Sequence, residues 1–431
     1  MLFGNVDRNA QGHLTFAGYD TVALAEQYGT PLYLMDEERI RENCRLYRSA
    51  FRKYFGENAL PLYASKAASF QRVYQIAEEE GMGVDTVSSG EIYTALRAGF
   101  PAERIYFHGN CKTDADIRYG VRSNIGYFVV DNEEELLQLD REAGQAGIRQ
   151  KILLRLTPGI DPHTYEAVST GKVNSKFGSA IETGQADAFA AEALRMEHLE
   201  LRGIHCHVGS QVFEEDVYQR AMDIMFRFMA DVREKYGATL TELNMGGGYG
   251  VRYTAQDSLI DIDARLFEVA DHLKKLAAQM NFPMPRFLME PGRSIVADAG
   301  MTLYSVGSVK RIPGYKNYVA VDGGMTDNPR YALYGARYTV LHAERDGEKE
   351  DCFDLVGRCC ESGDILQPKV MLPDSVHRGD KVAVCTTGAY NYSMASNYNR
   401  IPRPPVVMLA KDRTYVAVRR ETAEDLTARD V

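Results

Sequence analysis

Lys66 is the residue of this sequence with the clearest potential for covalent chemistry. It lies in the run Tyr63–Ala67, directly after an apolar stretch typical of a buried strand. Exclusion of water makes a lysine amine lose its proton more easily, and the neutral amine can then attack a carbonyl carbon. A lysine at such a position is more often a solvated loop charge, so its interpretation depends on other segments.

Five other segments carry residue types that complete a site for such a lysine. They are, in chain order, His205–Gln211 (HCHVGSQ), Gly246–Gly250 (GGGYG), Glu290–Arg293 (EPGR), Cys359–Asp364 (CCESGD) and Gly388–Tyr390 (GAY). Glycines after a strand expose backbone N–H groups to a phosphate, and an arginine offers a planar fork to a phosphate or a carboxylate. A carboxylate can keep a ring nitrogen protonated, so that the ring accepts electrons. Together these features indicate a site for pyridoxal 5'-phosphate (PLP).

The glycine and histidine segments also admit other interpretations. Gly246–Gly248 does not fit the dinucleotide fingerprint G-x-G-x-x-G, because Val251 occupies the last position. Three glycines alone more often form a tight turn, and histidines such as His205 and His207 more often pack in a core. These two histidines could share a metal ion, but no further cysteine–histidine cluster in the sequence completes a zinc site. We therefore expect no metal.

Composition disfavours several classes of protein. The chain has 431 residues, of which 45% are hydrophobic and 26% charged, an ordinary balance for two globular domains. A net charge of −10 disfavours nucleic acid as a partner. No apolar run reaches the roughly 20 residues of a membrane helix, and the first residues lack the pattern of a signal peptide. Seven cysteines without a C-x-x-C pair predict reduced thiols and a cytoplasmic location.

Short β-rich runs alternate with amphipathic helical stretches from about residue 31 to residue 290. This alternation predicts a (β/α)8 barrel of the TIM type, an α/β architecture whose active site lies at the carboxyl ends of the strands. We place the first strand at 31–36 and the second at 59–67, so that Lys66 ends the second strand. Ser88 and Glu91 predict a capping box for the helix that follows.

Strand-like runs dominate after residue 295 and predict an all-β domain of the β-sandwich or Greek-key type, which residues 1–30 would join. The predicted domains are therefore a barrel over 31–290, and a β domain made of 1–30 together with 291–431. Cys360, Glu361 and Tyr390 fall in this second domain.

The motifs follow one another from residue 63 to residue 402, and the whole chain resembles the fold type III (alanine-racemase-fold) family of PLP-dependent decarboxylases, most closely its diaminopimelate decarboxylases. The resemblance implies that Lys66 forms the Schiff base with PLP and that His207 stacks on the ring. Glu290 would meet the pyridine nitrogen, where racemases of this fold have an arginine. The other cofactor contacts implied by the resemblance are Asp85, Ser210, Gly246, Gly247, Gly248, Pro291, Gly292, Arg293 and Tyr390. His108, Asn110 and Arg155 resemble residues that shape the site.

The resemblance also implies how a substrate would be handled. Cys360 would protonate the carbon that has lost CO2, and Glu361 would bind the distal ammonium group. Both would reach into the site of a partner subunit, so a homodimer with shared sites is expected.

The distal end of the substrate decides specificity. Arg330 and Tyr334, four residues apart, could converge on a carboxylate, and Arg293 and Tyr390 would also contact the substrate. With Glu361 for an ammonium group, this set fits the second amino-acid head of meso-2,6-diaminopimelate. The expected reaction yields L-lysine and CO2, which is the last step of lysine biosynthesis.

Other functions stay open. The same chemistry could act on ornithine, lysine, a D-amino acid or carboxynorspermidine, although a buried Arg330 would repel the distal amine of a simple diamine precursor. A racemase is disfavoured by Glu290, and a non-catalytic PLP protein by the presence of both Lys66 and Cys360. The run 166–172 keeps the Thr-Gly pair of the family.

Overall fold

The structure is a computed structural model of the chain, and it describes residues 3–160, 175–345 and 349–431. The Thr-Gly run at 166–172 lies outside the described residues. The chain divides into two compact units. The β-rich unit comprises Met1–Glu42, Val251–Leu259 and Arg293–Val431, and the barrel unit comprises Asn43–Gly250 and Ile260–Gly292.

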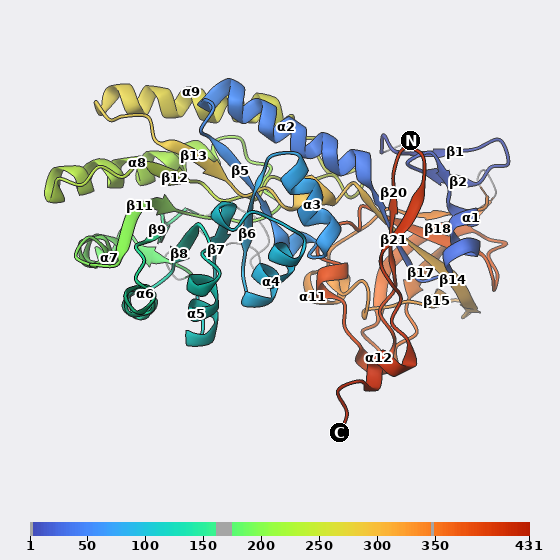
Figure 1. Ribbon diagram of the computed structural model, residues 1–431. Helices are drawn as coiled ribbons and strands as arrows, with labels where there is room; N and C mark the ends of the chain where they lie inside the picture. Colours follow the sequence, from blue (N-terminus) through green and yellow to red (C-terminus); the bar gives the residue numbers. More distant parts are fainter. Residues whose placement is uncertain (1–2, 161–174, 346–348) are drawn as a thin grey trace. The chain divides into compact units, whose positions relative to one another are not determined.

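The barrel unit contains a closed ring of parallel strands (Figure 1). The ring strands are β5 (Leu60–Ala64), β6 (Gly83–Thr86), β7 (Ile105–Phe107), β8 (Tyr127–Val130), β9 (Gln150–Thr157), β11 (Leu199–His205), β12 (Glu242–Asn244) and β13 (Arg286–Met289). Pairing of β13 with β5 and of β8 with β9 closes the ring. Strands such as β5 and β8 are buried along their whole length, because the ring interior covers one face and helices cover the other. The predicted TIM-type barrel is confirmed.

The helix before the first ring strand and the helices between the strands cover the outside of the ring (Figure 1). They are α2 (Glu37–Phe55), α3 (Gln71–Glu79), α4 (Ser89–Arg97), α5 (Asp114–Arg122), α6 (Glu133–Ala146), α7 (Gln185–Ala193), α8 (Val217–Tyr236) and α9 (Ile262–Gln279). Side chains define their ends. Thr113 and Asp116 form a reciprocal capping box at the start of α5, and Gly147 ends α6 in the left-handed conformation with φ of 67°. None of the described helices is long and apolar enough to cross a membrane.

The strand expected at 31–36 is not part of the ring. It forms β4 (Leu32–Asp36), which pairs with β14 and β20 in the β-rich unit. Because β4 is fully buried and precedes α2, its sequence pattern is the same as that of a β/α repeat of the barrel. The ring therefore begins at β5, and Lys66 follows the first barrel strand rather than the second.

The β-rich unit is built on a sheet of nine strands. Besides β4, these are β14 (Gly300–Arg311), β15 (Asn317–Val321), β16 (Val340–His342), β17 (Glu350–Val356), β18 (Ile365–Pro373), β19 (Lys381–Cys385), β20 (Val406–Leu409) and β21 (Thr414–Val418). A small sheet of β1 (Val6–Arg8), β2 (Leu14–Phe16) and β3 (Tyr19–Asp20) adds the N-terminal residues. The helices of this unit are α1 (Thr21–Tyr28), α10 (Arg293–Val296), α11 (Arg330–Tyr334) and α12 (Ala423–Thr427). A separate β-rich domain is thus confirmed.

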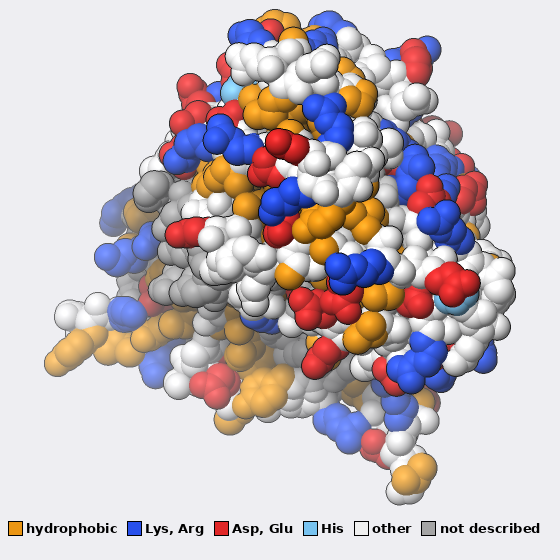
Figure 2. Space-filling view, turned by 90° about the vertical axis from the view of Figure 1, so that its left-hand side faces the viewer, with side chains coloured by type: hydrophobic (Ala, Val, Ile, Leu, Met, Phe, Trp, Pro, Cys, Tyr) orange, Lys and Arg blue, Asp and Glu red, His pale blue; other side chains and the backbone are white. Residues whose placement is uncertain are grey.

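Surface charge is mixed on the face drawn in Figure 2. Acidic and basic side chains lie close to one another there, and neither sign forms a continuous area. This face therefore offers no broad basic surface of the kind that binds a nucleic-acid backbone.

Gly203 tests the close packing of the barrel. A Cβ at this position would lie 1.9 Å from the backbone oxygen of Glu242 on the adjacent strand β12. We expect Gly203→Ala to reduce the free energy of unfolding by about 1–3 kcal/mol, as overpacking does elsewhere. Gly90→Ala is the control: its nearest neighbour, Oγ of Ser88, would lie 3.7 Å away, and alanine favours the helix. Equal thermal midpoints for the two variants would contradict the expectation.

Candidate active site

A polar residue lies at or near the carboxyl end of every strand of the ring. They are Lys66 after β5, Asp85 in β6, His108 after β7, Asp131 after β8, Arg155 in β9, His205 at the end of β11, Asn244 at the end of β12 and Glu290 after β13. All eight strands are parallel, so these positions share one mouth of the barrel.

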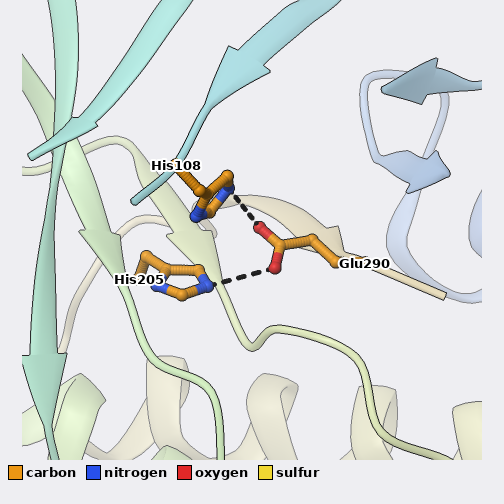
Figure 3. Close-up of side chains that lie close together, drawn as sticks. All are labelled: His108, His205 and Glu290. Atoms are coloured by element: carbon orange, nitrogen blue, oxygen red, sulfur yellow. Dashed lines mark hydrogen bonds and ion pairs between the residues drawn. The ribbon is translucent and has the colours of Figure 1, made fainter. Parts of the chain in front are cut away.

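The buried carboxylate of Glu290 is the hub of this mouth. Its Oε1 accepts a hydrogen bond of 2.7 Å from the Asn244 side chain and lies 2.8 Å from Nε2 of His108. Its Oε2 lies 3.2 Å from Nε2 of His205 (Figure 3). Three loops or strand ends thus contact one carboxylate, which fixes its orientation.

Electrostatics keep Glu290 ionised. Burial on its own would raise the pKa of Glu290, but His108 and His205 lower it well below its usual range. Burial lowers the pKa of His205 to about 4, so this histidine is neutral at pH 7 and binds Glu290 by donating from Nε2. Burial raises the pKa of Asp85, and the negative charge of Glu290 acts in the same direction. The mouth therefore has one firmly ionised carboxylate beside a second that is more easily protonated.

The same mouth also contains a possible set of metal ligands. Ligand atoms of His108, His205 and Glu290 lie within 4.8 Å of one another, a grouping that the sequence analysis did not foresee. A second such group, His342 with Glu344 and Asp380, lies in the β-rich unit. The expected absence of a metal stays a prediction.

Lys66 lies half-buried in a short 3-10 helix, η1 (Ser65–Ala67), at the end of β5. The Pro291–Gly292 segment runs beside it: the Ala64 N–H donates to the Pro291 carbonyl at 3.1 Å, and a Cβ on Gly292 would lie 2.9 Å from the Ala64 side chain. Glycine at position 292 therefore allows the segment after Glu290 to approach the strand that carries Lys66.

The Glu91 side chain contacts Ser65, the residue before Lys66, and this differs from the expected capping box. Ser88 caps α4 as expected by accepting from the Glu91 N–H. The Glu91 side chain does not return to the cap residue but accepts from the Val87 N–H at 2.8 Å and from Oγ of Ser65 at 2.7 Å. The buried hydroxyl of Ser65 is a stronger partner for the Glu91 carboxylate than the backbone N–H of Ser88, which water can also reach.

Gly246–Gly248 form a turn that only glycine fits. Gly246 and Gly248 have φ of 68° and 121°. A Cβ on Gly247 would lie 2.0 Å from the Glu290 backbone oxygen, and one on Gly246 would lie 2.8 Å from Nδ1 of His207. His207, in turn, accepts from the Gly247 N–H at 3.3 Å. The predicted phosphate cradle and the predicted ring-stacking histidine are therefore neighbours.

The barrel mouth fits PLP. The backbone N–H groups of Gly248 and Tyr249 make no hydrogen bond within the described residues, so they are available to a phosphate. Oδ1 of Asp85 is buried and makes no hydrogen bond among the described residues. Arg155 lies 3.8 Å from Asp131 and over the Phe177 ring at 4.3 Å, which fixes its guanidinium at the mouth. An amine, an ionised carboxylate and free N–H groups are the donor set that PLP requires.

Arg293, Arg330 and Tyr390 come together within the β-rich unit. The Arg293 guanidinium lies 4.8 Å from the centre of the Tyr390 ring, and that of Arg330 lies 6.0 Å from it. Both arginines also donate to the hydroxyl of Tyr253, at 2.6 Å and 3.2 Å. This part of the predicted substrate site therefore forms one cationic cluster.

Three predicted substrate residues of the β-rich unit are exposed. Tyr334 is 39% exposed, whereas Arg330 at the start of the same helix is buried. Cys360 and Glu361 are exposed on the loop between β17 and β18. The Cys360 N–H donates to Asn399 at 2.7 Å, so this loop is held by a hydrogen bond. Convergence of Arg330 and Tyr334 on one carboxylate stays a prediction.

Sequence reasoning missed Asn244, Tyr253 and Tyr338. Asn244 had one usable signal, because it lies two residues before the glycine turn. Tyr253 and Tyr338 belong to no motif that we recognised. Tyr338 lies only eight residues from Arg330, whereas Tyr253 contacts both arginines across distant parts of the chain.

Reductive trapping tests the role of Lys66. With PLP added, sodium borohydride should attach a phosphopyridoxyl group to the peptide that contains Lys66, because the neutral amine binds the aldehyde carbon reversibly until reduction. Mass spectrometry of the digested protein locates the added mass. The variant Lys66→Arg should show none, while Lys53→Arg, which changes an exposed lysine on α2, should be labelled at Lys66 like the unmodified chain. Label on another lysine would overturn the assignment.

Comparison with known proteins agrees with this geometry. Residues 37–297 match the family described as pyridoxal-dependent decarboxylase, pyridoxal binding domain. A diaminopimelate decarboxylase of Bacillus subtilis is 45% identical over 431 residues, covering 100% of this chain and 98% of its own.

Solved structures show the same relationship. A diaminopimelate decarboxylase from M. jannaschii in complex with L-lysine has a TM-score of 0.92 and 33% identity, covering 100% of this chain and 98% of its own. A lysine/ornithine decarboxylase from Vibrio vulnificus in complex with cadaverine has a TM-score of 0.76 and 27% identity, with 91% and 98% covered. The chain therefore belongs to the PLP-dependent decarboxylases, and within them to the diaminopimelate decarboxylase family.

Proposed function

We propose that this protein decarboxylates meso-2,6-diaminopimelate to L-lysine and CO2 with PLP as cofactor, as the last step of lysine biosynthesis. The observation that carries the choice of substrate is the state of Arg330. It is 6% exposed, and no carboxylate among the described residues forms an ion pair with it. A buried charge without an ionic partner is costly, so a carboxylate from a ligand is the expected partner.

PLP, when bound, takes up the electron pair released as the scissile carbon–carbon bond breaks. The protein supplies the conditions for that step. Lys66 offers the amine that binds the cofactor, and the ionised Glu290 stabilises a proton on the ring nitrogen. The turn at Gly246–Gly248 binds the phosphate through backbone N–H groups, and His207 packs against the same turn.

The remote end of the substrate orients the reacting end. We assign its carboxylate to Arg330, with Tyr334 and Arg293 beside it, and its ammonium group to Glu361. Binding energy from this remote head holds the carboxylate that leaves in the orientation needed for bond breaking. Cys360 then delivers a proton to the carbon that has lost CO2, and L-lysine results.

Cys360 and Glu361 support a homodimer with shared sites. Both are exposed on a loop whose backbone is held by Asn399 and by a hydrogen bond from the Gly363 N–H to Glu361 at 3.1 Å. An exposed loop that is fixed by hydrogen bonds and carries a thiol and a carboxylate is suited to enter the site of a second copy of the chain, as the family resemblance implies. The seven cysteines are free thiols, which supports a reducing, cytoplasmic location.

A related decarboxylase activity on lysine or ornithine is the second candidate. The likeness to the lysine/ornithine decarboxylase of Vibrio vulnificus favours it. Those substrates carry one carboxylate, which leaves as CO2, and they offer no anion to Arg330.

A substrate panel tests the proposed reaction. Release of CO2 is measured with meso-2,6-diaminopimelate, L-ornithine, L-lysine and D-lysine, with PLP added. We expect turnover of the first alone. Arg330→Met should lower its kcat/KM by about 10- to 150-fold, the equivalent of one charge-assisted hydrogen-bonded contact. Arg337→Met, at an exposed arginine of the same unit, should leave it unchanged. Preferred turnover of a substrate with one carboxylate would reject the proposal.

Hybrid dimers test the shared site. Lys66→Ala and Cys360→Ala proteins should each be nearly inactive, because each lacks one group that the reaction needs. Mixing them should restore part of the activity, since some hybrid sites then contain both intact residues. Subunit exchange is verified with differently tagged chains. If exchange occurs and activity stays at the level of the separate variants, Cys360 acts within its own subunit.

A further inference from the structure

Arg330 is held on one side by two buried tyrosines. Its Nη1 donates to the hydroxyl of Tyr253 at 3.2 Å and to that of Tyr338 at 2.7 Å. Its Nε is buried and has no hydrogen-bond partner among the described residues. A guanidinium binds a carboxylate through two N–H groups on one edge. The tyrosines therefore occupy Nη1, whereas no group among the described residues bonds to Nε.

Unlike Tyr338, Tyr253 contacts both arginines of the cluster. Its hydroxyl oxygen accepts from Nη1 of Arg293 at 2.6 Å as well as from Arg330. Its ring lies under both guanidinium groups, at 5.8 Å from Arg293 and 5.3 Å from Arg330. Two like charges that share one acceptor repel each other less than two bare charges would, so this phenol allows both to stay buried together.

The position of Tyr253 is itself fixed. Its backbone N–H donates to Asp257 at 3.0 Å, and its carbonyl accepts from Thr339 at 2.8 Å. Its ring meets that of Tyr338 edge-on, at 5.3 Å between centres. Burial would raise the pKa of Tyr253, but the two guanidinium groups outweigh this and lower it. The hydroxyl is thus a strong acceptor on a rigid support.

We propose that Tyr253 is a positioning residue for substrate selection. Its hydroxyl fixes the Arg330 guanidinium so that the Nε edge faces the distal carboxylate of the substrate, and it links this arginine to Arg293. The proposal deepens the proposed function and rests on it. Tyr253 takes no part in bond breaking, so its effect belongs in the binding of substrates that have a distal carboxylate.

Tyr253→Phe removes the hydroxyl while keeping the ring. We expect KM for meso-2,6-diaminopimelate to rise about 10-fold, the loss of one hydrogen bond to a charged group, with kcat changed less than twofold. Any slow turnover of D-lysine should be unaffected, because D-lysine has no distal carboxylate. Tyr28→Phe is the matched control, since it also removes a tyrosine hydroxyl that is hydrogen-bonded within the β-rich unit, to Thr414 at 2.6 Å. It should leave KM unchanged.

A double-variant cycle distinguishes an effect of Tyr253 through Arg330 from a non-specific disturbance of the structure. In an Arg330→Met background, Tyr253→Phe should cause a clearly smaller further loss, because only its contact with Arg293 is left to lose. Additive losses, an unchanged KM, or an equal fall with D-lysine would each overturn the proposal. Tyr338→Phe provides a second variant with the same expected direction, should Tyr253→Phe not fold.

Binding of pimelate, a dicarboxylate without amines, distinguishes failure of this proposal from failure of the proposed function. Calorimetry with the PLP-loaded protein measures its affinity without turnover. Weaker binding to Tyr253→Phe than to Tyr28→Phe supports the positioning role even if meso-2,6-diaminopimelate is not decarboxylated. Equal affinity for both variants rejects it, even if the substrate panel succeeds.

Discussion

The buried, ionised carboxylate of Glu290 is the constraint on which the barrel mouth depends. A carboxylate away from water stays charged only when polar partners surround it; here His205 and Asn244 form hydrogen bonds with it, and the His108 ring lies 2.8 Å away. These three residues come from the ends of β7, β11 and β12, so their meeting requires the ring to close. The glycine turn after β12 also depends on the position of Glu290, because only a residue without a side chain fits against the Glu290 backbone oxygen.

Much of this arrangement could be predicted from the sequence. Lys66, Glu290 and the glycines follow apolar strands, and the carboxyl ends of parallel strands meet in a barrel. The placement of β4 could not be predicted, because a fully buried strand before a helix has the same pattern in either unit. The contacts of Tyr253 and Asn244 could not be predicted either, because their partners are far away in the chain. Sequence motifs show which residues could take part in a reaction. The partners that these residues contact depend on the tertiary fold.

The two units carry different chemical tasks in the proposed reaction. The barrel unit contains the amine, the carboxylate and the phosphate-binding turn, which together suit the cofactor. The β-rich unit contains the paired arginines and their tyrosine supports, which suit an anionic substrate group. Family members that share the cofactor chemistry can therefore differ in substrate through residues such as Arg330, without disturbing the environment of Glu290.

The path of the chain between the units has a consequence for biosynthesis. The β-rich unit takes its residues from three separate stretches, including Val251–Leu259 with Tyr253, and β4 pairs with β14 and β20. On the ribosome, β4 emerges before the whole barrel and must wait for the last third of the polypeptide before its neighbours exist. A fragment ending before residue 293 would carry β4, a mostly apolar strand that is buried in the full chain, without its partner strands. Truncated chains should therefore be substrates for chaperones and proteases, even though the ring of the barrel would be complete.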